Sequence, residues 1–155
     1  MSTVTPTRTP DATSTSRPSL MATRWGRWGM MVVGGILVLS LLRVVTGAAG
    51  FVGSHLSQQL LAQGHTVTGI DAFIPYYPRP LKETNLAPLR AHANFRFVEA
   101  DLRTAELAPH VAGADTVFHL AALVAIPYSY VAPDSYMETN VKGTLNICQA
   151  ALDNG

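Results

Sequence analysis

The stretch that most constrains the fold is residues 46–53, TGAAGFVG, which holds three glycines spaced three apart. A β-branched run at 43–46 leads into it, and a helical period over 50–63 follows, with Gly64 as its stop. A glycine-rich turn between a strand and a helix is the context of a dinucleotide-binding loop. The stretch therefore predicts a phosphate cradle, and the alternative is a tight strand-to-helix turn without a ligand.

Each of the three glycines has its own physical reason. Gly47 permits the tight turn, because a residue without a Cβ adopts unusual backbone angles at little cost. Gly50 lets the backbone approach a pyrophosphate, and Gly53 lets the helix pack closely on the strand. The N–H groups at the start of the helix would then face the anion.

Downstream of this loop, short β-branched runs alternate with helical periods. The predicted elements are strands at 66–70, 95–100 and 116–122, helices at 81–91, 104–113 and 133–154, and loops at 72–80 and 127–133. Such alternation indicates a parallel sheet with helices on both faces. We therefore predict an α/β fold with a Rossmann-type, doubly wound parallel sheet.

Asp71 closes the second of these strands, 18 residues after Gly53. A carboxylate at this place accepts hydrogen bonds from the hydroxyls of an adenosine ribose. It would also repel a 2′-phosphate, and no arginine adjoins it in the sequence DAFI, which favours NAD over NADP. The alternative is an ordinary carboxylate in a loop at the end of a strand.

Five blocks occur in order along the chain: TGAAGFVGSHL, GIDAF, EADLR, HLAA and NVKGTLNICQAA. Together they resemble the NAD-dependent epimerase/dehydratase family, which are extended short-chain dehydrogenase/reductases that act on nucleotide sugars. The resemblance covers about residues 43–155. The stretches at 71–86 and 126–140 are similar to loops of UDP-glucuronate and other UDP-sugar 4-epimerases, with 4,6-dehydratases and decarboxylases as alternatives.

The resemblance implies roles for individual residues. The backbone amides of Phe51 and Val52 would meet the pyrophosphate. Asp101 and Leu102 would hold the adenine, and the small apolar strand end at 120–122 would run beside the cofactor. Asn140 resembles a family asparagine near the cofactor, although an asparagine within a helix often bonds only neighbouring backbone. The expected cofactor-binding residues are Gly47, Gly50, Phe51, Val52, Gly53, Asp71, Asp101, Leu102, Leu120, Ala121, Ala122 and Asn140.

Three further side chains, Tyr76, Tyr77 and Lys82, are expected either to cover the edge of the adenine or to have a specific role. His119 is interpreted as a bonded strand residue and not as a catalyst. We expect no metal site. The resemblance also implies homodimer formation through the helix at 133–154.

Catalysis in this family runs through a Tyr-x-x-x-Lys pair and a Ser or Thr, and the tyrosine exchanges a proton with the sugar hydroxyl. The chain has two lysines, and the residues four positions before them are Pro78 and Glu138, so it contains no Tyr-x-x-x-Lys. We therefore expect no catalytic residue, and interpret the chain as the NAD-binding half of a UDP-sugar 4-epimerase, truncated after about four strands. A non-catalytic dinucleotide-binding module is the alternative, and whether the chain is an enzyme stays open.

The first 42 residues do not fit this domain. Residues 1–23 are rich in Ser, Thr and Pro and are expected to be disordered. The apolar segment 24–42 is interpreted as an upstream extension, with a membrane anchor and a secretory signal as alternatives. Its thirteen residues between Gly29 and Arg43 would make a helix of about 20 Å, short of the ~30 Å hydrocarbon core. The protein is thus expected in the cytoplasm, or else as a single-pass membrane protein held by 25–45.

Charge and cysteine content exclude other classes. Residues 1–43 carry five Arg and one Asp, a net charge of +4, and the remainder carries six basic and nine acidic residues, a net charge of −3. An acidic body argues against a nucleic-acid-binding surface. The one cysteine, Cys148, excludes an internal disulfide and suits a reducing compartment. Its apolar helical surroundings predict a buried position.

Overall fold

The computed structural model describes residues 29–33 and 36–154, and its larger sheet is parallel throughout. The strands stand in the order β5-β4-β3-β6, so the chain begins this sheet at its centre and extends it to both sides. This is the predicted α/β sheet. Its members are β3 (Leu42–Thr46), β4 (Thr66–Asp71), β5 (Phe95–Glu99) and β6 (Thr116–His119).

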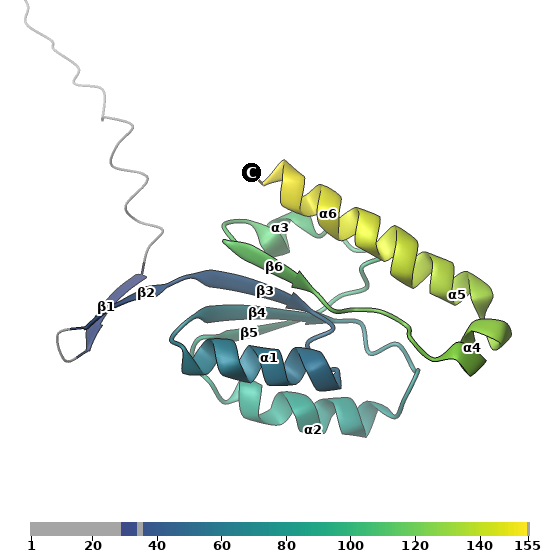
Figure 1. Cartoon of the computed structure of the whole chain (residues 1–155), viewed down its shortest axis with the longest axis horizontal. Coiled ribbons are helices and arrows are strands. Elements are labelled where there is room, and N and C mark those ends of the chain that lie inside the picture. Colours follow the sequence, from purple (N-terminus) through teal and green to yellow (C-terminus); the bar gives the residue numbers. More distant parts are fainter. Residues whose placement is uncertain (1–28, 34–35, 155) are drawn as a thin grey trace, which may run out of the picture.

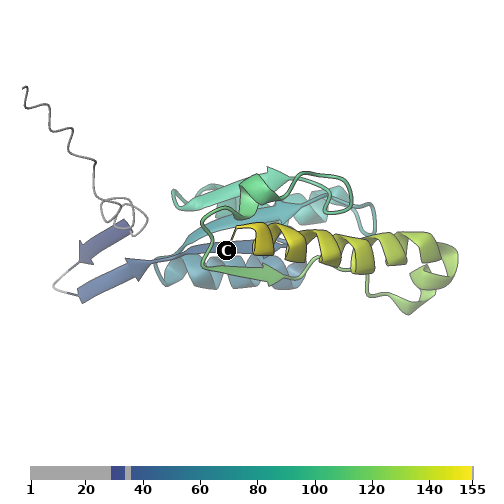
Figure 2. The same cartoon turned by 90° about the horizontal axis from the view of Figure 1, so that it is seen from above.

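Helices cover both faces of this sheet (Figure 1). One face carries α1 (Phe51–Ala62) and α2 (Arg79–Arg90), and the other carries α3 (Ala108–Val111) and α6 (Gly143–Asp153). Figure 2 shows α6 running along the sheet close to β6. The result is three layers, which is the architecture expected when parallel strands are joined by helical crossovers.

Successive side chains of a strand point to opposite faces of the sheet, and this divides the hydrophobic core into two parts. Val44 and Val45 are neighbours in β3 and both are fully buried, but they pack into different clusters. Toward α1 and α2 the cluster contains Val45, Ala48, Leu60, Leu61, Val67, Leu86 and Leu89. Toward α3 and α6 it contains Val44, Ile70, Leu102, Leu107, Val111, Ile147 and Ala150.

The helix predicted over 133–154 is present, but its middle departs from α-helical geometry. It begins as α5 (Pro133–Met137), passes through the π-helical turn η2 (Glu138–Lys142) and continues as α6. In η2 the N–H of Gly143 donates to the carbonyl of Glu138, five residues back. The expected burial of Cys148 within α6 is wrong, because its side chain is exposed.

The loop predicted between residues 127 and 133 is instead a short helix, α4 (Ile126–Val131). Pro127 lies in its first turn, where the missing N–H of proline has no intrahelical acceptor to lose. Prolines at both ends of the segment suggested a loop, but they are compatible with the starts of two successive short helices.

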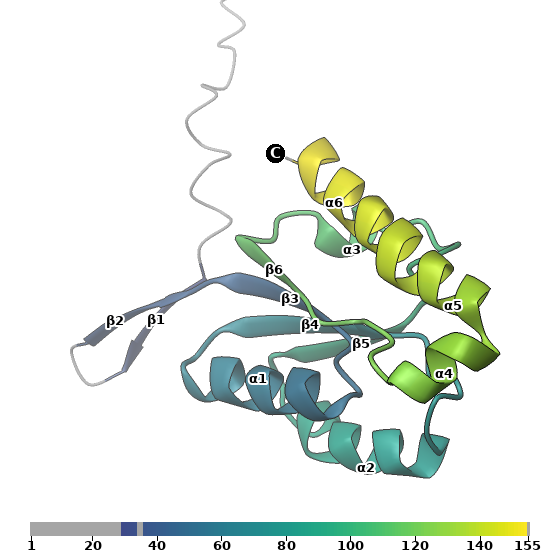
Figure 3. The ribbon, with the colours of Figure 1, turned by 45° about the vertical axis from the view of Figure 1, so that its right-hand side comes forward.

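The apolar segment before the domain contains two described strands, β1 (Gly29–Val33) and β2 (Ile36–Ser40). They pair antiparallel, with Gly29 opposite Ser40, and lead into β3 beyond the end of the larger sheet (Figure 3). Within 29–33 and 36–154 no helix is long and apolar enough to cross a membrane. The tail predicted as disordered, 1–23, lies outside the described residues.

Candidate cofactor site

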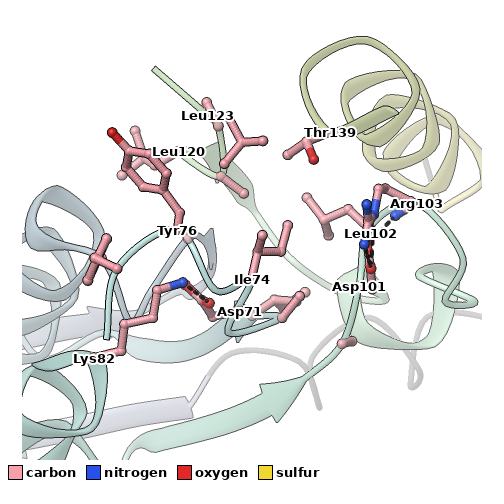
Figure 4. Close-up of a pocket in the computed structure, with 18 residues that line it drawn as sticks. Asp71, Ile74, Tyr76, Lys82, Asp101, Leu102, Arg103, Leu120, Leu123 and Thr139 are labelled. Carbon is pink, nitrogen blue, oxygen red and sulfur yellow. Dashed lines mark hydrogen bonds and ion pairs between the residues drawn. The ribbon is translucent and has the colours of Figure 1, made fainter. Parts of the chain in front are cut away.

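A cleft opens at the carboxyl ends of the parallel strands. The register places Thr46 opposite both Ile70 and His119, so β3, β4 and β6 end together. The cleft has an empty volume of about 660 Å³, open solvent included, and lies where ligands bind in open α/β sheets (Figure 4). Of the residues predicted for the cofactor, it is lined by Gly47, Gly50, Asp71, Asp101, Leu102, Leu120, Ala121 and Ala122.

The glycine turn is compact for two separate reasons. Gly47 has a φ of +70°, and a Cβ there would lie 2.9 Å from the backbone nitrogen of Ala121. A Cβ on Gly53 would lie 2.2 Å from the carbonyl oxygen of Gly47. Both distances are impossible for a larger residue without backbone movement, so the turn touches the segment after β6 on one side and the start of α1 on the other.

Gly50 is the N-cap of α1, and its N–H donates to the carbonyl of Gly47 at 2.9 Å. Phe51 and Val52 follow as the first helical residues, with 72% and 62% of their surfaces exposed. Neither residue is among those that line the cleft. The first N–H groups of an α-helix have no intrahelical acceptor and suit an anion.

Asp71 ends β4 with a carboxylate that is already well bonded. It accepts the N–H of Ala49 at 3.2 Å and of Phe73 at 2.8 Å, and Lys82 Nζ lies 3.1 Å from Oδ1. No cationic residue adjoins Asp71 in the sequence, but the fold brings Lys82 of α2 next to its carboxylate. The pKa of Tyr77, also in the cleft wall, is raised by burial and by the nearby charge of Asp71.

Asp101 is held by Arg103 through four hydrogen bonds. Oδ1 accepts from the backbone N–H and from Nε, both at 2.9 Å, and Oδ2 accepts from Nε at 3.0 Å and from a terminal nitrogen at 2.6 Å. These bonds lower the pKa of Asp101, against an opposing contribution from partial burial. The adjacent Leu102 is buried, and its carbonyl accepts from Asn146 at 2.8 Å.

The segment after β6 is fixed from two sides. Thr46 Oγ1 accepts the N–H of Leu120 at 3.1 Å and of Ala121 at 3.2 Å. Asn140 brackets Leu123, accepting its N–H and donating to its carbonyl, both at 2.8 Å. Asn140 does not line the cleft, and its backbone partner lies 17 residues away in sequence, so it positions the cleft wall instead of bonding its own helix.

His119 connects these two supports. Its Nδ1 lies 2.8 Å from Thr46 Oγ1, and its Nε2 lies 2.9 Å from Thr144 Oγ1. Thr144 in turn donates to the carbonyl of Asn140 at 2.6 Å. Because Thr46 Oγ1 already accepts two N–H groups, we assign its proton to His119 Nδ1 and the imidazole proton to Nε2. Burial lowers the pKa of His119, which favours this neutral form.

Several residues of the site were not predicted from the sequence. Arg103 stands inside the EADLR block, so a local signal for it existed. Thr139, which lines the cleft, likewise lies inside the stretch 126–140. Asn85, whose side chain donates to the carbonyl of Ala49 at 3.0 Å, gave no such signal. Across the described part of the chain, no group of three or more His, Cys, Asp or Glu side chains could hold a metal ion.

The order β5-β4-β3-β6, the glycine turn between β3 and α1, and an acidic residue at the end of β4 define a dinucleotide-binding domain of the Rossmann type. Residues 43–155 match the model of the NAD dependent epimerase/dehydratase family. The match covers well over half of the sequence, and the chain belongs to this family.

Similar proteins include a probable UDP-glucuronate 4-epimerase from Rhizobium meliloti, 35% identical over 111 residues that make up 70% of this chain and 33% of that protein. UDP-glucuronate 4-epimerase 1 from Arabidopsis thaliana is 41% identical over 124 residues, 76% of this chain and 28% of that protein. The chain therefore spans about a third of the length of the curated relatives it matches.

A similar solved structure is that of UDP-glucuronic acid 4-epimerase from Bacillus cereus in complex with UDP-glucuronic acid and NAD. It superimposes with a TM-score of 0.68 at 36% identity, covering 71% of this chain and 36% of that one.

Proposed function

We propose that this chain is the NAD-binding portion of a UDP-sugar 4-epimerase. The observation that carries the proposal is the cleft itself, where a glycine turn, Asp71 and the Asp101–Leu102 pair meet at one edge of a parallel sheet. The names of the relatives support the sugar class, since one is named a probable UDP-glucuronate 4-epimerase and another UDP-glucuronate 4-epimerase 1. None of those names favours a 4,6-dehydratase or a decarboxylase.

Each part of the cofactor has a candidate partner in the cleft or at its edge. The backbone N–H groups of Phe51 and Val52, at the start of α1, suit the pyrophosphate. The Asp71 carboxylate would accept hydrogen bonds from the adenosine ribose, and the Leu102 side chain would pack on a face of the adenine. The small side chains of Ala121 and Ala122 leave room for the remainder of the dinucleotide. When bound, NAD supplies the hydride-transfer chemistry, and these residues hold and orient it.

The chain has no Tyr-x-x-x-Lys pair, so by itself it binds the cofactor without turnover. Calorimetric titration of the 155-residue protein with NAD and NADP tests the first half of this statement, with NAD expected to bind more tightly. An assay of UDP-sugar interconversion tests the second half. Turnover above a blank without protein would contradict it, and binding of neither dinucleotide would remove the proposal as a whole.

A non-catalytic module that senses the cofactor or docks on a partner is the second candidate, because the catalytic pair is absent from this sequence. The DNA downstream of codon 155 separates the two. A continuing reading frame that encodes a Ser or Thr and a Tyr-x-x-x-Lys favours the epimerase, and a stop codon directly after codon 155 favours the module.

The long helix is proposed to mediate a homodimer. Along this helix, exposed and mostly apolar residues recur every three or four positions and so form one stripe. Such a stripe is the pattern of a helix that packs on another helix. The stripe consists of Met137, Val141, Leu145, Cys148 and Leu152. Sedimentation velocity should give a dimer for the wild type and a monomer for Leu145→Glu. A monomeric wild type at all concentrations would contradict the dimer.

We place the protein in the cytoplasm, because its single cysteine, Cys148, is an exposed free thiol that suits a reducing compartment. The competing location is a membrane surface reached through residues 25–45. Carbonate extraction of cell membranes separates the two, since a membrane-inserted chain stays in the pellet and a cytoplasmic chain does not.

A further inference from the structure

Four tyrosine rings form a continuous row beside the cleft. Tyr77 and Tyr76 belong to the loop after β4, Tyr128 belongs to α4 and Tyr136 to α5. The centroids of neighbouring rings lie 6.0, 5.5 and 6.1 Å apart along the row. Aromatic rings attract one another at such distances. The row therefore joins two segments of the chain that lie far apart in the sequence.

The row begins at the glycine turn and leads from one wall of the cleft to the other. Tyr76 and Tyr77 line the cleft, and a Cβ on Gly50 would lie 3.6 Å from the hydroxyl of Tyr77. Figure 4 shows the Tyr76 side chain extending from its loop toward Leu120, in the segment after β6 that forms a second wall. The contact of Tyr76 with Tyr128 thus ties the first wall to the helix that follows the second.

The helix that carries Tyr128 is weakly attached. Helix α4 contains no buried residue and has no side-chain bond at its N-cap, Ala125. Figure 1 shows it at the end of the molecule, beyond the carboxyl ends of the strands. It is held by the ring of Tyr76, by the ring of Tyr136 and by the Tyr136 hydroxyl, which donates to the carbonyl of Ala125. Segments with few buried contacts open at a small cost in free energy.

The loop after β4, in contrast, is firmly held. Phe73 is buried, and its N–H donates to Asp71 Oδ1 at 2.8 Å. Lys82 Nζ lies 3.1 Å from the same oxygen and 5.1 Å from the centre of the Tyr77 ring. If the contact between the two segments breaks, α4 is therefore the part that moves.

We propose that α4 is a lid on the cleft, held closed by the contact between Tyr76 and Tyr128, and that the dinucleotide enters and leaves only when this contact is broken. The inference rests on the proposed function and adds to it a step that controls the rates of binding. Tyr128 is not among the residues that line the cleft, so its ring acts on access to the cleft and not on the bound ligand.

A lid contact has a kinetic consequence that distinguishes it from a ligand contact. One aromatic pair favours the closed arrangement about fivefold. Its loss destabilises the closed form equally with and without the ligand, so the rate constants of association and dissociation both rise and the dissociation constant does not change. Loss of a ligand contact instead raises the dissociation constant, chiefly through faster dissociation.

Surface plasmon resonance with NAD over the immobilised full chain gives both rate constants. Tyr128→Leu should raise each of them about fivefold and leave the dissociation constant within about twofold of the wild type. Tyr128→Phe keeps the ring and should behave as the wild type. Tyr130→Leu is the matched control, because Tyr130 lies on the same helix, is 83% exposed and has no ring contact within the described part of the chain. It should leave both rate constants unchanged.

Tyr76→Leu removes the same contact from the other side, and it decides the proposal even if Tyr128→Leu fails to fold. Its association rate constant should also rise about fivefold. Association is the quantity to compare, because Tyr76 lines the cleft and its loss can change dissociation directly. In the double variant Tyr76→Leu/Tyr128→Leu the association rate constant should equal that of Tyr76→Leu, since the contact is already absent.

An unchanged association rate constant in Tyr128→Leu or in Tyr76→Leu would overturn the lid, as would increases that multiply in the double variant. An equal increase in Tyr130→Leu would also overturn it, because it would assign the effect to α4 in general. These results all require a wild type that binds NAD. A wild type without measurable NAD binding would refute the proposed function, and this inference with it.

Discussion

Lys82 and Asp71 form a buried ion pair at the wall of the cleft, with Nζ 3.1 Å from Oδ1 and side chains only 9% and 7% exposed. Asp71 ends β4 and Lys82 lies in α2, so the pair closes the proline-rich segment between them. The lysine also places a positive charge beside the carboxylate that the sequence suggested as a barrier to a 2′-phosphate.

Replacement of Lys82 by methionine should destabilise the protein by about 3 kcal/mol, because it leaves the Asp71 carboxylate buried without a counter-charge. Urea unfolding measures the loss. The double variant Asp71→Asn/Lys82→Met should regain part of it, since no unpaired charge remains. The matched control is Arg79→Met, which breaks exposed pairs with Glu83 and Glu99 and should have a much smaller effect. Equal losses at the two sites would contradict this account.

Substitutions at two glycines of the turn should separate folding from binding. Gly53→Ala places a Cβ 2.2 Å from a carbonyl oxygen of the turn and should lower stability by roughly 3 kcal/mol or more. Gly50→Ala places it 3.1 Å from the same oxygen, so the fold should survive while the approach of a pyrophosphate is obstructed. Thermal melts report the first effect and NAD titration the second. A well-folded Gly53→Ala protein with unchanged stability would be inconsistent with the packing described.

The glycine turn was predictable because its causes are local. Gly47, Gly50 and Gly53 are close in sequence, and each is required by backbone crowding within the strand–turn–helix unit itself. The alternation of strands and helices in turn fixed the parallel sheet, since its hydrophobic periods are read within single elements. All four strands of this sheet begin within one residue of their predicted starts, but β6 ends at His119 and not at residue 122 as predicted.

The side-chain partners were not predictable, because they join residues that the sequence separates. Lys82 reaches Asp71 across a loop, Arg103 pairs with the carboxylate assigned to the adenine, and Asn140 bonds backbone 17 residues away. A residue pattern gives the type of an element but not the direction in which its polar side chains point. The exposure of Cys148 was missed for the same reason, since an apolar helix does not reveal which face it buries.

Stability should fall as the pH drops below about 6.5, the ordinary pKa of histidine. Burial lowers the pKa of His119 in the folded protein, so below 6.5 the unfolded chain binds a proton that the folded chain refuses. The contribution is complete above 6.5 and is lost as the pH falls toward the lowered pKa. Protonation would also place a third donor against Thr46 Oγ1, which already accepts two N–H groups. Urea unfolding at several pH values, compared with His119→Gln, isolates this group. A stability difference between the two proteins that does not change with pH would refute it.

Replacement of Asn140 by alanine should loosen the cleft wall from outside the cleft. The variant loses both hydrogen bonds to the backbone of Leu123, a residue only 4% exposed, and leaves its N–H and carbonyl buried without partners. We expect a loss of about 2 kcal/mol in stability, faster amide exchange at Leu123 and weaker NAD binding. Asn154→Ala is the matched control, because its side chain also donates to two backbone carbonyls, those of Ala108 and Ala150, but at the far end of α6. It should lower stability while leaving the NAD affinity unchanged. If both variants weakened NAD binding equally, the effect would reflect general destabilisation and Asn140 would have no special role in positioning the cleft wall.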